Sequence, residues 1–435
     1  MRVMKDSGIE WIGEIPQNWH ATRIKYCTAI DQEKLSEKTD PEYTFQYIDI
    51  SGVTEYGGIG ETTEMTFEKS PSRARMIVKP GDTIISTVRT YLKAVAYIDS
   101  LGDRICSTGF CVLSPKKDLF PKFAYYVLQS DYVVQKIVSE SVGVSYPAIS
   151  STEIGDIKIA LPEYVVQARI ADYLDAKCAE IDALITAKEK TNALLKERRQ
   201  SIIYEAVTKG LDPTAPMKDS GVEWIGEIPE GWSTRRVKHL ATEADTLFLD
   251  GDWINSDVIT DQGVRYLTSG NVGEGSFKEQ GTGRISEETF EKMNCLKALP
   301  GDLMICRLNL PLGRCCIIPP EEPYYVVAVD NVILRPDSNM DKRYLAYCMN
   351  TPGYASSAFM AASGTTMQRI SRTDLGNLSV PIAPFDKQIE IADYLDAQCR
   401  AIDSAIISID LTVQKLKEYR QSLIYEAVTG KIEID

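Results

Sequence analysis

Residues 167–182 read QARIADYLDAKCAEID, and residues 388–403 read QIEIADYLDAQCRAID. The two stretches share 11 of 16 residues at a constant offset of 221, whereas ordinary composition would give roughly one chance match. The same offset aligns ERRQSIIYEAVT at 197–208 with EYRQSLIYEAVT at 418–429, where 10 of 12 residues are identical. The chain therefore contains one sequence unit twice.

Each copy predicts one long helix. Residues 163–209 contain neither Gly nor Pro, and the apolar residues of both copies alternate by four and three, which is the a/d pattern of a coiled coil. In the second copy this seam runs from Leu395 to Ala427, and Lys188 and Asn192 interrupt the seam of the first copy but not that of the second. We expect the two helices to pair antiparallel within one chain, because the intervening domain can return the chain to its start. The alternative is two unrelated amphipathic surface helices.

A second repeat opens each half. Residues 4–19 and 217–232 share 13 of 16 residues, and the linker-like stretch 210–216 (GLDPTAP) separates the halves. The apolar residues of the first copy, which include Trp11 and Trp19, predict an extended arm that is pinned by its aromatic side chains. We interpret this arm as a structural seal of a domain rather than a functional site.

The regions between arm and helix predict mixed α/β domains of similar fold. Residues 26–78 and 239–298 show no convincing alignment, but the later parts agree again from the Pro-Gly-Asp turns at 80–82 and 300–302. A helix is expected from Pro121 through Ile137. Strands are expected at 94–98, 110–113, 315–318 and 326–334. The predicted fold class is α+β, with similar mixed α/β domains at 1–161 and 211–383 and long helices at 162–210 and 384–435.

Composition sets limits on function. The chain has 435 residues, a net charge of −14, 44% hydrophobic and 25% charged residues, as in an ordinary soluble protein. No large segment has a basic excess, so DNA binding would depend on local clusters or on partner subunits. The N-terminus lacks an apolar signal sequence and no run of 18 apolar residues occurs, which favours a cytoplasmic protein that does not span a membrane.

The search for catalytic motifs is negative. The sequence has no GxxxxGK[ST] loop, no GxGxxG after a strand and no HExxH. Ten cysteines lack a CxxC pair and only two histidines occur, so neither a metal site nor a disulfide framework is expected. The sequence therefore predicts no catalytic residues and no cofactor, although a cryptic cluster of charged residues stays open.

The organisation resembles a known family. Each half begins with SGxEWIGEIPxxW and ends with IADYLDAxCxxID followed by RQSxIYEAVT, and two divergent domains alternate with two nearly identical helices. This arrangement is similar to the DNA-specificity subunit of Type I restriction–modification systems. The resemblance implies two target-recognition domains on double-stranded DNA, with the helices as spacer and as docking surface. The implied partners are two methyltransferase (modification) subunits, later joined by restriction (translocase/nuclease) subunits.

Candidate DNA contacts are polar side chains in loops near the aligned strands. Arg, Asn and Gln suit base readout, and Ser and Thr suit bases or phosphates. The candidates in the first domain are Arg73, Arg75, Arg89, Tyr91, Ser107, Thr108, Ser145 and Tyr146, and those in the second are Arg307, Asn309, Asn331, Thr365, Thr366, Gln368 and Arg369. Because the two domains differ, the expected target is bipartite and asymmetric.

Candidate docking residues are repeated residues that lie off the helix seam, since coiled-coil burial alone does not require them to match. These residues are Asp172, Tyr173, Tyr204 and Glu205, with their counterparts Asp393, Tyr394, Tyr425 and Glu426. Two other classes of protein remain as alternatives: a coiled-coil scaffold that binds only proteins, and an enzyme with a cryptic site.

Overall fold

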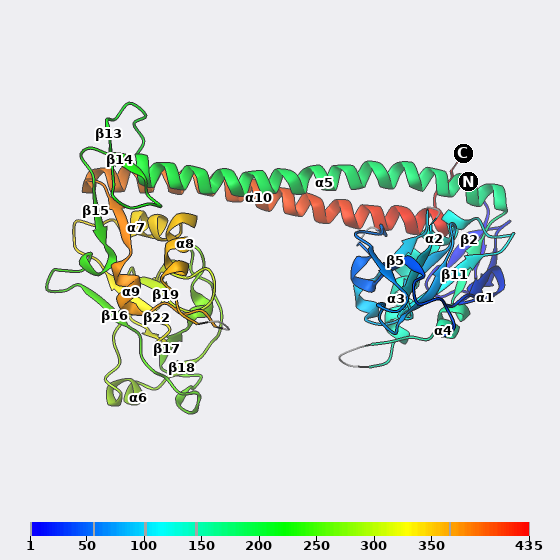
Figure 1. The fold of residues 1–435 in the computed structure, drawn as a ribbon, viewed down its shortest axis with the longest axis horizontal. Helices are drawn as coiled ribbons and strands as arrows, with labels where there is room; N and C mark the ends of the chain where they lie inside the picture. The colour runs from blue at the N-terminus through cyan, green and yellow to red at the C-terminus, as the bar shows by residue number, and fades with distance from the viewer. Residues whose placement is uncertain (1, 55–56, 100–101, 144–146, 365–366, 435) are drawn as a thin grey trace. The chain divides into compact units, whose positions relative to one another are not determined.

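The chain divides into two compact units. The computed structural model describes residues 2–54, 57–99, 102–143, 147–364 and 367–434. The first unit contains Met1–Lys190 and Ile409–Asp435, and the second contains Thr191–Ser408. Each unit therefore combines one globular domain with parts of both long helices (Figure 1).

The two long helices of the sequence analysis are confirmed. Helix α5 spans Tyr164–Lys209 and helix α10 spans Phe385–Val428. Gly210 follows α5 with φ +76°, and Gly430 follows α10 with φ +70°. A glycine in this left-handed conformation is a common helix terminator, because it lacks the Cβ that would clash there.

The helices pack along their apolar seams in the first unit. Leu174, Ile181 and Ile185 of α5 share a core with Val413 and Leu423 of α10. Beside them the Arg420 guanidinium, only 4% exposed, donates to Asp182 Oδ1 at 2.9 Å and to Gln129 Oε1 at 3.2 Å. A buried cation needs such partners, because its desolvation is otherwise costly.

The second unit has the same helix packing, but here the C-terminal part of α5 packs against the N-terminal part of α10. Ile203 and Ala206 of α5 share a core with Leu395 and Cys399 of α10. The counterpart of Arg420 is Arg199, whose Nε lies 3.0 Å from Asp403 Oδ1. In both units a C-terminal segment of one helix meets an N-terminal segment of the other, so the predicted antiparallel pairing is confirmed.

Two small sheets form the domain of the first unit. One has the order β6-β5-β10-β7 and the other the order β4-β11-β8-β9. Strands β5 and β10 are parallel, with Gln46 opposite Arg104. The strands are β4 (Thr28–Ile30), β5 (Thr44–Ile48), β6 (Thr63–Thr66), β7 (Ala74–Val78), β8 (Thr83–Ser86), β9 (Val95–Tyr97), β10 (Arg104–Ser107) and β11 (Phe110–Pro115).

The domain of the second unit has a similar topology, but one of its sheets has three strands instead of four, because an isolated bridge between Ala298 and Tyr325 stands where β7 would be. Its sheets have the orders β18-β17-β21 and β16-β22-β19-β20, and β17 and β21 are again parallel. The strands are β16 (Leu247–Asp250), β17 (Val264–Leu267), β18 (Arg284–Ile285), β19 (Leu303–Cys306), β20 (Cys315–Ile317), β21 (Val326–Val327) and β22 (Asn331–Arg335). Residues 26–78 and 239–298 thus share a fold that their sequences do not reveal, and the single strand expected at 326–334 is two strands separated by a turn.

Short helices cover the sheets. The helix expected from Pro121 through Ile137 is wrong in one respect, because the extended backbone of Ser130 (φ −65°, ψ 144°) divides it into two. The helices are α1 (Ile24–Cys27), α2 (Pro121–Gln129), α3 (Asp131–Glu140), α4 (Ser151–Asp156), α6 (Glu287–Lys292), α7 (Lys342–Met349), α8 (Pro352–Met360) and α9 (Arg372–Asn377). The 3₁₀ turns are η1 (Ile50–Gly52), η2 (Thr90–Leu92), η3 (Val237–His239), η4 (Ser256–Val258) and η5 (Ser269–Asn271). None of the helices in the described part of the chain combines the length and hydropathy needed to cross a bilayer.

The two arms are hairpins, and their end strands close the domains. The hairpins are β1 (Met4–Asp6) with β2 (Glu14–Pro16), and β13 (Met217–Asp219) with β14 (Glu227–Pro229). Strand β3 (His20–Arg23) then pairs with β12 (Lys158–Leu161), and β15 (Ser233–Arg236) pairs with β23 (Ser379–Ile382).

The expectation that aromatic residues pin the first arm holds only in part. Trp19 is buried, but Trp11 is 50% exposed. In the second arm Trp224 packs on Tyr354 and against Gly353, where an added Cβ would lie 2.9 Å from the indole. The first domain has Tyr132 at the position of Gly353, and the Tyr132 ring packs edge-on against Tyr425.

Substitution of two neighbouring residues of α5 tests which of them lies in the buried helix seam. Ile185 is fully buried, whereas Leu184 is 52% exposed. We predict that Ile185→Ala lowers the free energy of unfolding by about 2–5 kcal/mol, because it leaves a cavity in the seam. Leu184→Ala should change it by less than about 0.5 kcal/mol. Urea denaturation of both variants measures this difference, and equal losses would contradict the seam assignment.

Candidate nucleic-acid interface

In the first unit, three loops meet beyond the end of β8. The amide of Arg89 donates to the Pro147 carbonyl at 2.9 Å, and the amide of Ile149 donates to the Thr87 carbonyl at 2.9 Å. The amide of Thr87 also donates to Gly109 O at 2.8 Å. We name residues 86–93, 107–109, 141–143 and 147–149 the first loop junction.

The second unit has the equivalent arrangement beyond β19. The amide of Asn309 donates to Gln368 O at 3.4 Å, and the amide of Ile370 donates to Arg307 O at 3.0 Å. The amide of Arg307 donates in turn to Asp330 O at 2.9 Å. We name residues 306–313, 328–331, 362–364 and 367–370 the second loop junction. The same backbone scaffold therefore occurs twice, with different side chains.

Both junctions hold a non-glycine residue in a left-handed conformation at the same place. Arg89 has φ 50° and Asn309, at an offset of 220, has φ 61°. Lys93 adds a third such residue, with φ 52°. This conformation costs about 1–3 kcal/mol for a residue with a Cβ, and it concentrates at functional sites. Its occurrence at equivalent positions makes the loops after β8 and β19 the strongest candidates for a reading surface.

The structure brings several candidates of the first domain to this surface. Arg89, Tyr91 and Thr108 are exposed at the first loop junction. Arg73 is exposed beside it, with its carbonyl accepting from the Thr108 amide and its guanidinium 3.4 Å from Asp49. Ser145 and Tyr146 lie outside the described residues.

Two candidates of the first domain have structural roles instead. Ser107 is 1% exposed, so its hydroxyl does not reach the surface. The Arg75 guanidinium stacks 4.6 Å from the Phe67 ring and donates to the Ala74 carbonyl at 2.9 Å. Burial and these internal contacts argue against DNA contacts by either side chain.

In the second domain, burial also removes two candidates. Asn331 is fully buried and bonds to Ala328 O and Ser269 Oγ. Arg307 is 6% exposed and lies 3.1 Å from Asp250. Sequence alone could not separate these polar residues from surface ones, because buried polar groups with partners carry no distinct pattern.

Asn309, Gln368 and Arg369 remain at the second loop junction. Asn309 is exposed, and Gln368 and Arg369 are half-buried. Arg369 pairs with Asp330 at 3.1 Å, and Gln368 Oε1 is a buried acceptor without a hydrogen-bond partner among the described residues. Thr365 and Thr366 lie outside the described residues.

Charged residues that the sequence analysis missed support this junction. Asp250 lies 3.1 Å from Arg307 and 3.5 Å from Arg372. Burial lowers the pKa of Arg307, and the positive charges of Arg369 and Arg372 act in the same direction, while Asp250 raises it. An arginine stays charged despite such a shift, so Arg307 is a buried cation, and Arg369 and Arg372 are the partly exposed cations near it.

Arg314 was also missed, and it organises the loop after β19. Its guanidinium donates to the carbonyls of Asn309 at 2.8 Å, Pro311 at 3.0 Å and Val272 at 3.1 Å. The first domain has Ala94 at this position, so the two loops are held by different means. A lone arginine after a strand gives no sequence signal for this role.

The comparisons with known proteins agree with this doubled architecture. Residues 23–196 match the family model described as Type I restriction modification DNA specificity domain. The MjaVIII specificity subunit of Methanocaldococcus jannaschii is 23% identical over 97% of this chain and 94% of its own length. The EcoKI specificity subunit of Escherichia coli K12 is 22% identical over 97% and 90%. Residues 23–196 thus match a DNA specificity domain, and nearly the whole chain is similar to Type I restriction enzyme specificity subunits.

Two solved structures share the fold of this chain. One comes from work on complex assembly and conformational transition of the type I R-M system, with a TM-score of 0.76, 22% identity and coverage of 96% of this chain and 99% of that chain. The other is the HsdS subunit from Thermoanaerobacter tengcongensis, with a TM-score of 0.52, 23% identity and coverage of 96% and 98%.

Several repeated residues of the two long helices have intramolecular partners. Tyr425 Oη lies 3.4 Å from the Trp11 carbonyl, and Tyr204 Oη donates to the Ile225 carbonyl at 3.3 Å. Each tyrosine thus contacts the arm of the domain in its own unit. This contact gives the tyrosine repeat a cause other than a partner subunit.

The remaining docking candidates are accessible to different extents. Asp172, Glu205 and Asp393 are exposed, and Tyr394 is 39% exposed. Tyr173 packs at the edge of the core, and Asp393 also pairs with Arg343 at 2.7 Å. Glu426 is half-buried and accepts from Ser422 Oγ at 3.2 Å.

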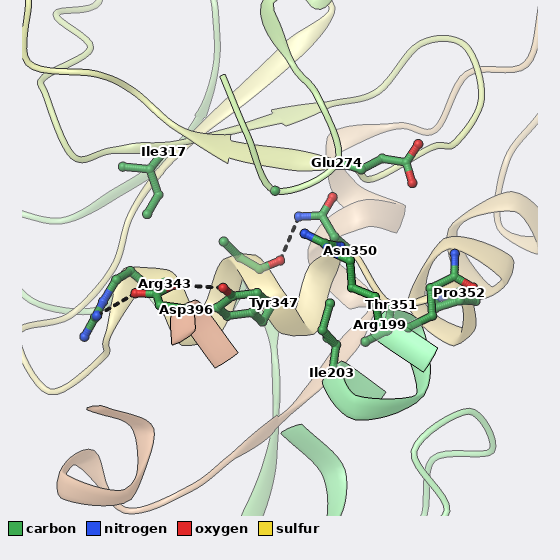
Figure 2. A pocket seen from close by; sticks show the side chains of 13 residues that line it. Arg199, Ile203, Glu274, Ile317, Arg343, Tyr347, Asn350, Thr351, Pro352 and Asp396 are labelled. Carbon is green, nitrogen blue, oxygen red and sulfur yellow. Dashed lines mark hydrogen bonds and ion pairs between the residues drawn. The ribbon is translucent and has the colours of Figure 1, made fainter. Parts of the chain in front are cut away.

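A repeated polar cluster fastens each domain to its helix. In the second unit it borders a cavity of about 150 Å³, where Arg343 Nη1 and Tyr347 Oη each donate to the Asp396 carboxylate at 2.8 Å (Figure 2). In the first unit Lys122 pairs with Asp175, and Tyr126 Oη donates to Asp175 at 2.8 Å. Burial and the adjacent carboxylate raise the pKa of both tyrosines. They therefore stay protonated as hydrogen-bond donors, which suits a structural clamp.

The described residues contain no cluster of three or more His, Cys, Asp or Glu that could hold a metal ion. The ten cysteines are buried. Burial raises the pKa of Cys27 and Cys178 to about 11. Such thiols are protonated at neutral pH and are poor nucleophiles.

Arg314 tests how the second loop junction is held. We predict that Arg314→Met increases amide hydrogen exchange in residues 307–313, because several loop carbonyls lose their common donor. Exchange in residues 86–93 of the other junction should not change. Arg400→Met, a change at an exposed site on α10, serves as the control. Unchanged protection of 307–313 would contradict the role of Arg314.

Proposed function

We propose that this specificity subunit binds one asymmetric bipartite DNA target, and that each domain reads one half-site through its loop junction. The observation that carries the proposal is a backbone scaffold that occurs twice with different side chains. At the equivalent left-handed position the first junction has Arg89 and the second has Asn309. Arg suits guanine and Asn suits adenine in the major groove, so two different half-sites follow.

The acidic total charge is compatible with this function because the basic groups are local. Arg89 and Lys93 lie on the loop after β8, and Arg369 and Arg372 lie near the loop after β19. Phosphate contacts supply affinity, whereas base contacts supply specificity. We infer that partner subunits contribute much of the phosphate contact in the complex.

The subunit is not catalytic on its own. In Type I systems methyl transfer and DNA cleavage belong to separate modification and restriction subunits, and a methyltransferase must also extrude its target base. We propose that this chain recruits two modification subunits and later restriction subunits, and that the complex acts in the cytoplasm. A scaffold without DNA binding is not favoured, since residues 23–196 match a DNA specificity domain.

The repeated exposed helix residues support recruitment of the same partner twice. Asp172 and Asp393 are exposed and occupy equivalent positions of the two helices. Each unit would therefore present one docking site that includes its own copy. The helices would also set the distance between the half-sites.

A domain exchange tests the assignment of half-sites. Replacing residues 20–160 with the corresponding domain of another specificity subunit should change one half of the methylated target and leave the other half intact. Genome-wide methylation mapping in cells that also carry the modification subunit gives the target directly. A change in both half-sites together would contradict independent reading.

Charge reversal tests the docking proposal. The double variant Asp172→Arg/Asp393→Arg should weaken copurification with the modification subunit at least about tenfold, because both sites lose complementary charge. Glu180→Arg is the matched control, since Glu180 is an exposed helix residue whose counterpart is Ala401. Equal retention of the partner by both variants would require another docking surface.

A further inference from the structure

Both loop junctions expose large apolar side chains at the loop that follows the equivalent strand. Tyr91 is 54% and Leu92 is 47% exposed after β8, and Leu310 is 61% exposed after β19. Further exposed apolar residues, Val142 and Met367, lie in the adjoining loops. Exposed apolar groups that gather at one place mark interaction sites.

The loop that carries Tyr91 and Leu92 is held firmly. Thr90 between Arg89 and Tyr91 is 3% exposed, and its hydroxyl lies 2.8 Å from Ser141 Oγ. The amide of Leu92 donates to the Arg89 carbonyl at 2.8 Å, and left-handed residues flank the turn on both sides. The two exposed side chains are therefore presented on an ordered 3₁₀ turn rather than on a loose loop.

Leu310 also lies on an ordered loop, which is held by different contacts. It lies between Asn309 in the left-handed conformation and Pro311, whose ring fixes its own φ. The Arg314 guanidinium bonds to the carbonyls of both neighbours, at 2.8 Å and 3.0 Å. Two different sets of contacts thus present exposed apolar residues on the same loop of the shared scaffold, although not at equivalent positions, since the equivalent of Leu310 is the buried Thr90.

We propose that Tyr91 with Leu92 in the first domain, and Leu310 in the second, insert between adjacent base pairs as wedges. This inference rests on the proposed DNA-binding function. Apolar side chains that enter a base step unstack it and bend the duplex, so that more protein surface reaches the DNA. The neighbouring cations Arg89 and Lys93 favour a nucleic acid over an apolar protein surface, since both can contact flanking phosphates.

The test uses the intact subunit without modification subunits, so that base extrusion by a methyltransferase does not contribute. The probe is a duplex of the target found by methylation mapping, with 2-aminopurine placed at one position at a time in each half-site. Its fluorescence rises when the neighbouring base step is unstacked. We expect a rise at one step in each half-site, and Leu310→Ala should abolish it in the second domain's half-site only.

The double variant Tyr91→Ala/Leu92→Ala should abolish the rise in the first domain's half-site only. Each variant should also bind the duplex about tenfold more weakly, as expected for loss of stacking on one base. Tyr26→Ala and Met293→Ala are matched controls, because these residues are 66% and 40% exposed and lie outside both junctions. Both controls should keep the fluorescence rise.

The outcomes separate the wedge from the function on which it rests. Failure of the subunit and its complexes to bind the duplex would overturn the proposed function itself. Specific binding without any fluorescence rise would overturn the wedge alone. A rise that persists in the variants, together with loss of modification-subunit binding, would assign these residues to a protein interface instead.

Discussion

The antiparallel contact between the two helix copies is the interaction on which each unit depends. Arg420 with Asp182 in the first unit, and Arg199 with Asp403 in the second, mark the same position in a seam that is otherwise mostly apolar. A buried ion pair contributes little net stability compared with apolar packing, but an unpaired buried charge is strongly destabilising. Any other register would leave Arg420 buried without its carboxylate. The pair therefore selects one alignment of the helices.

This contact also explains which residues are repeated. Each domain core contains the N-terminal half of its following helix and the C-terminal half of the other helix. The same set of contacts is therefore built twice. Each set consists of a cation and a tyrosine on α2 or α7, an aspartate on one long helix, and a tyrosine on the other long helix that contacts the arm. The loops after β8 and β19 take no part in these contacts, so their side chains can differ while their backbone conformation is retained. A fixed backbone frame with variable surface side chains suits a protein that must read different sequences with one assembly.

The sequence was informative where one physical pattern dominated. Heptad spacing predicted both long helices and their pairing, and the repeat predicted two similar domains. The break at Ser130 was missed because the apolar face continues through it on both sides. The common topology of residues 26–78 and 239–298 was hidden because strands a few residues long require only alternating burial, which many sequences satisfy. Among the candidate contacts, composition could not distinguish the exposed Asn309 from the buried Asn331, and Arg314 acts through backbone carbonyls that no sequence pattern reveals.

In the function proposed above, two equivalent loop junctions in one chain read two different half-sites. Site-specific photo-crosslinking tests it most directly. A photoreactive amino acid is placed at position 89 or position 309 in the complex with its modification subunits, which is then irradiated on its mapped target. The account predicts that the adduct from position 89 maps to one half-site and the adduct from position 309 to the other. Adducts from both positions in the same half-site, or from neither position while a photoreactive group at Met293 crosslinks, would contradict it.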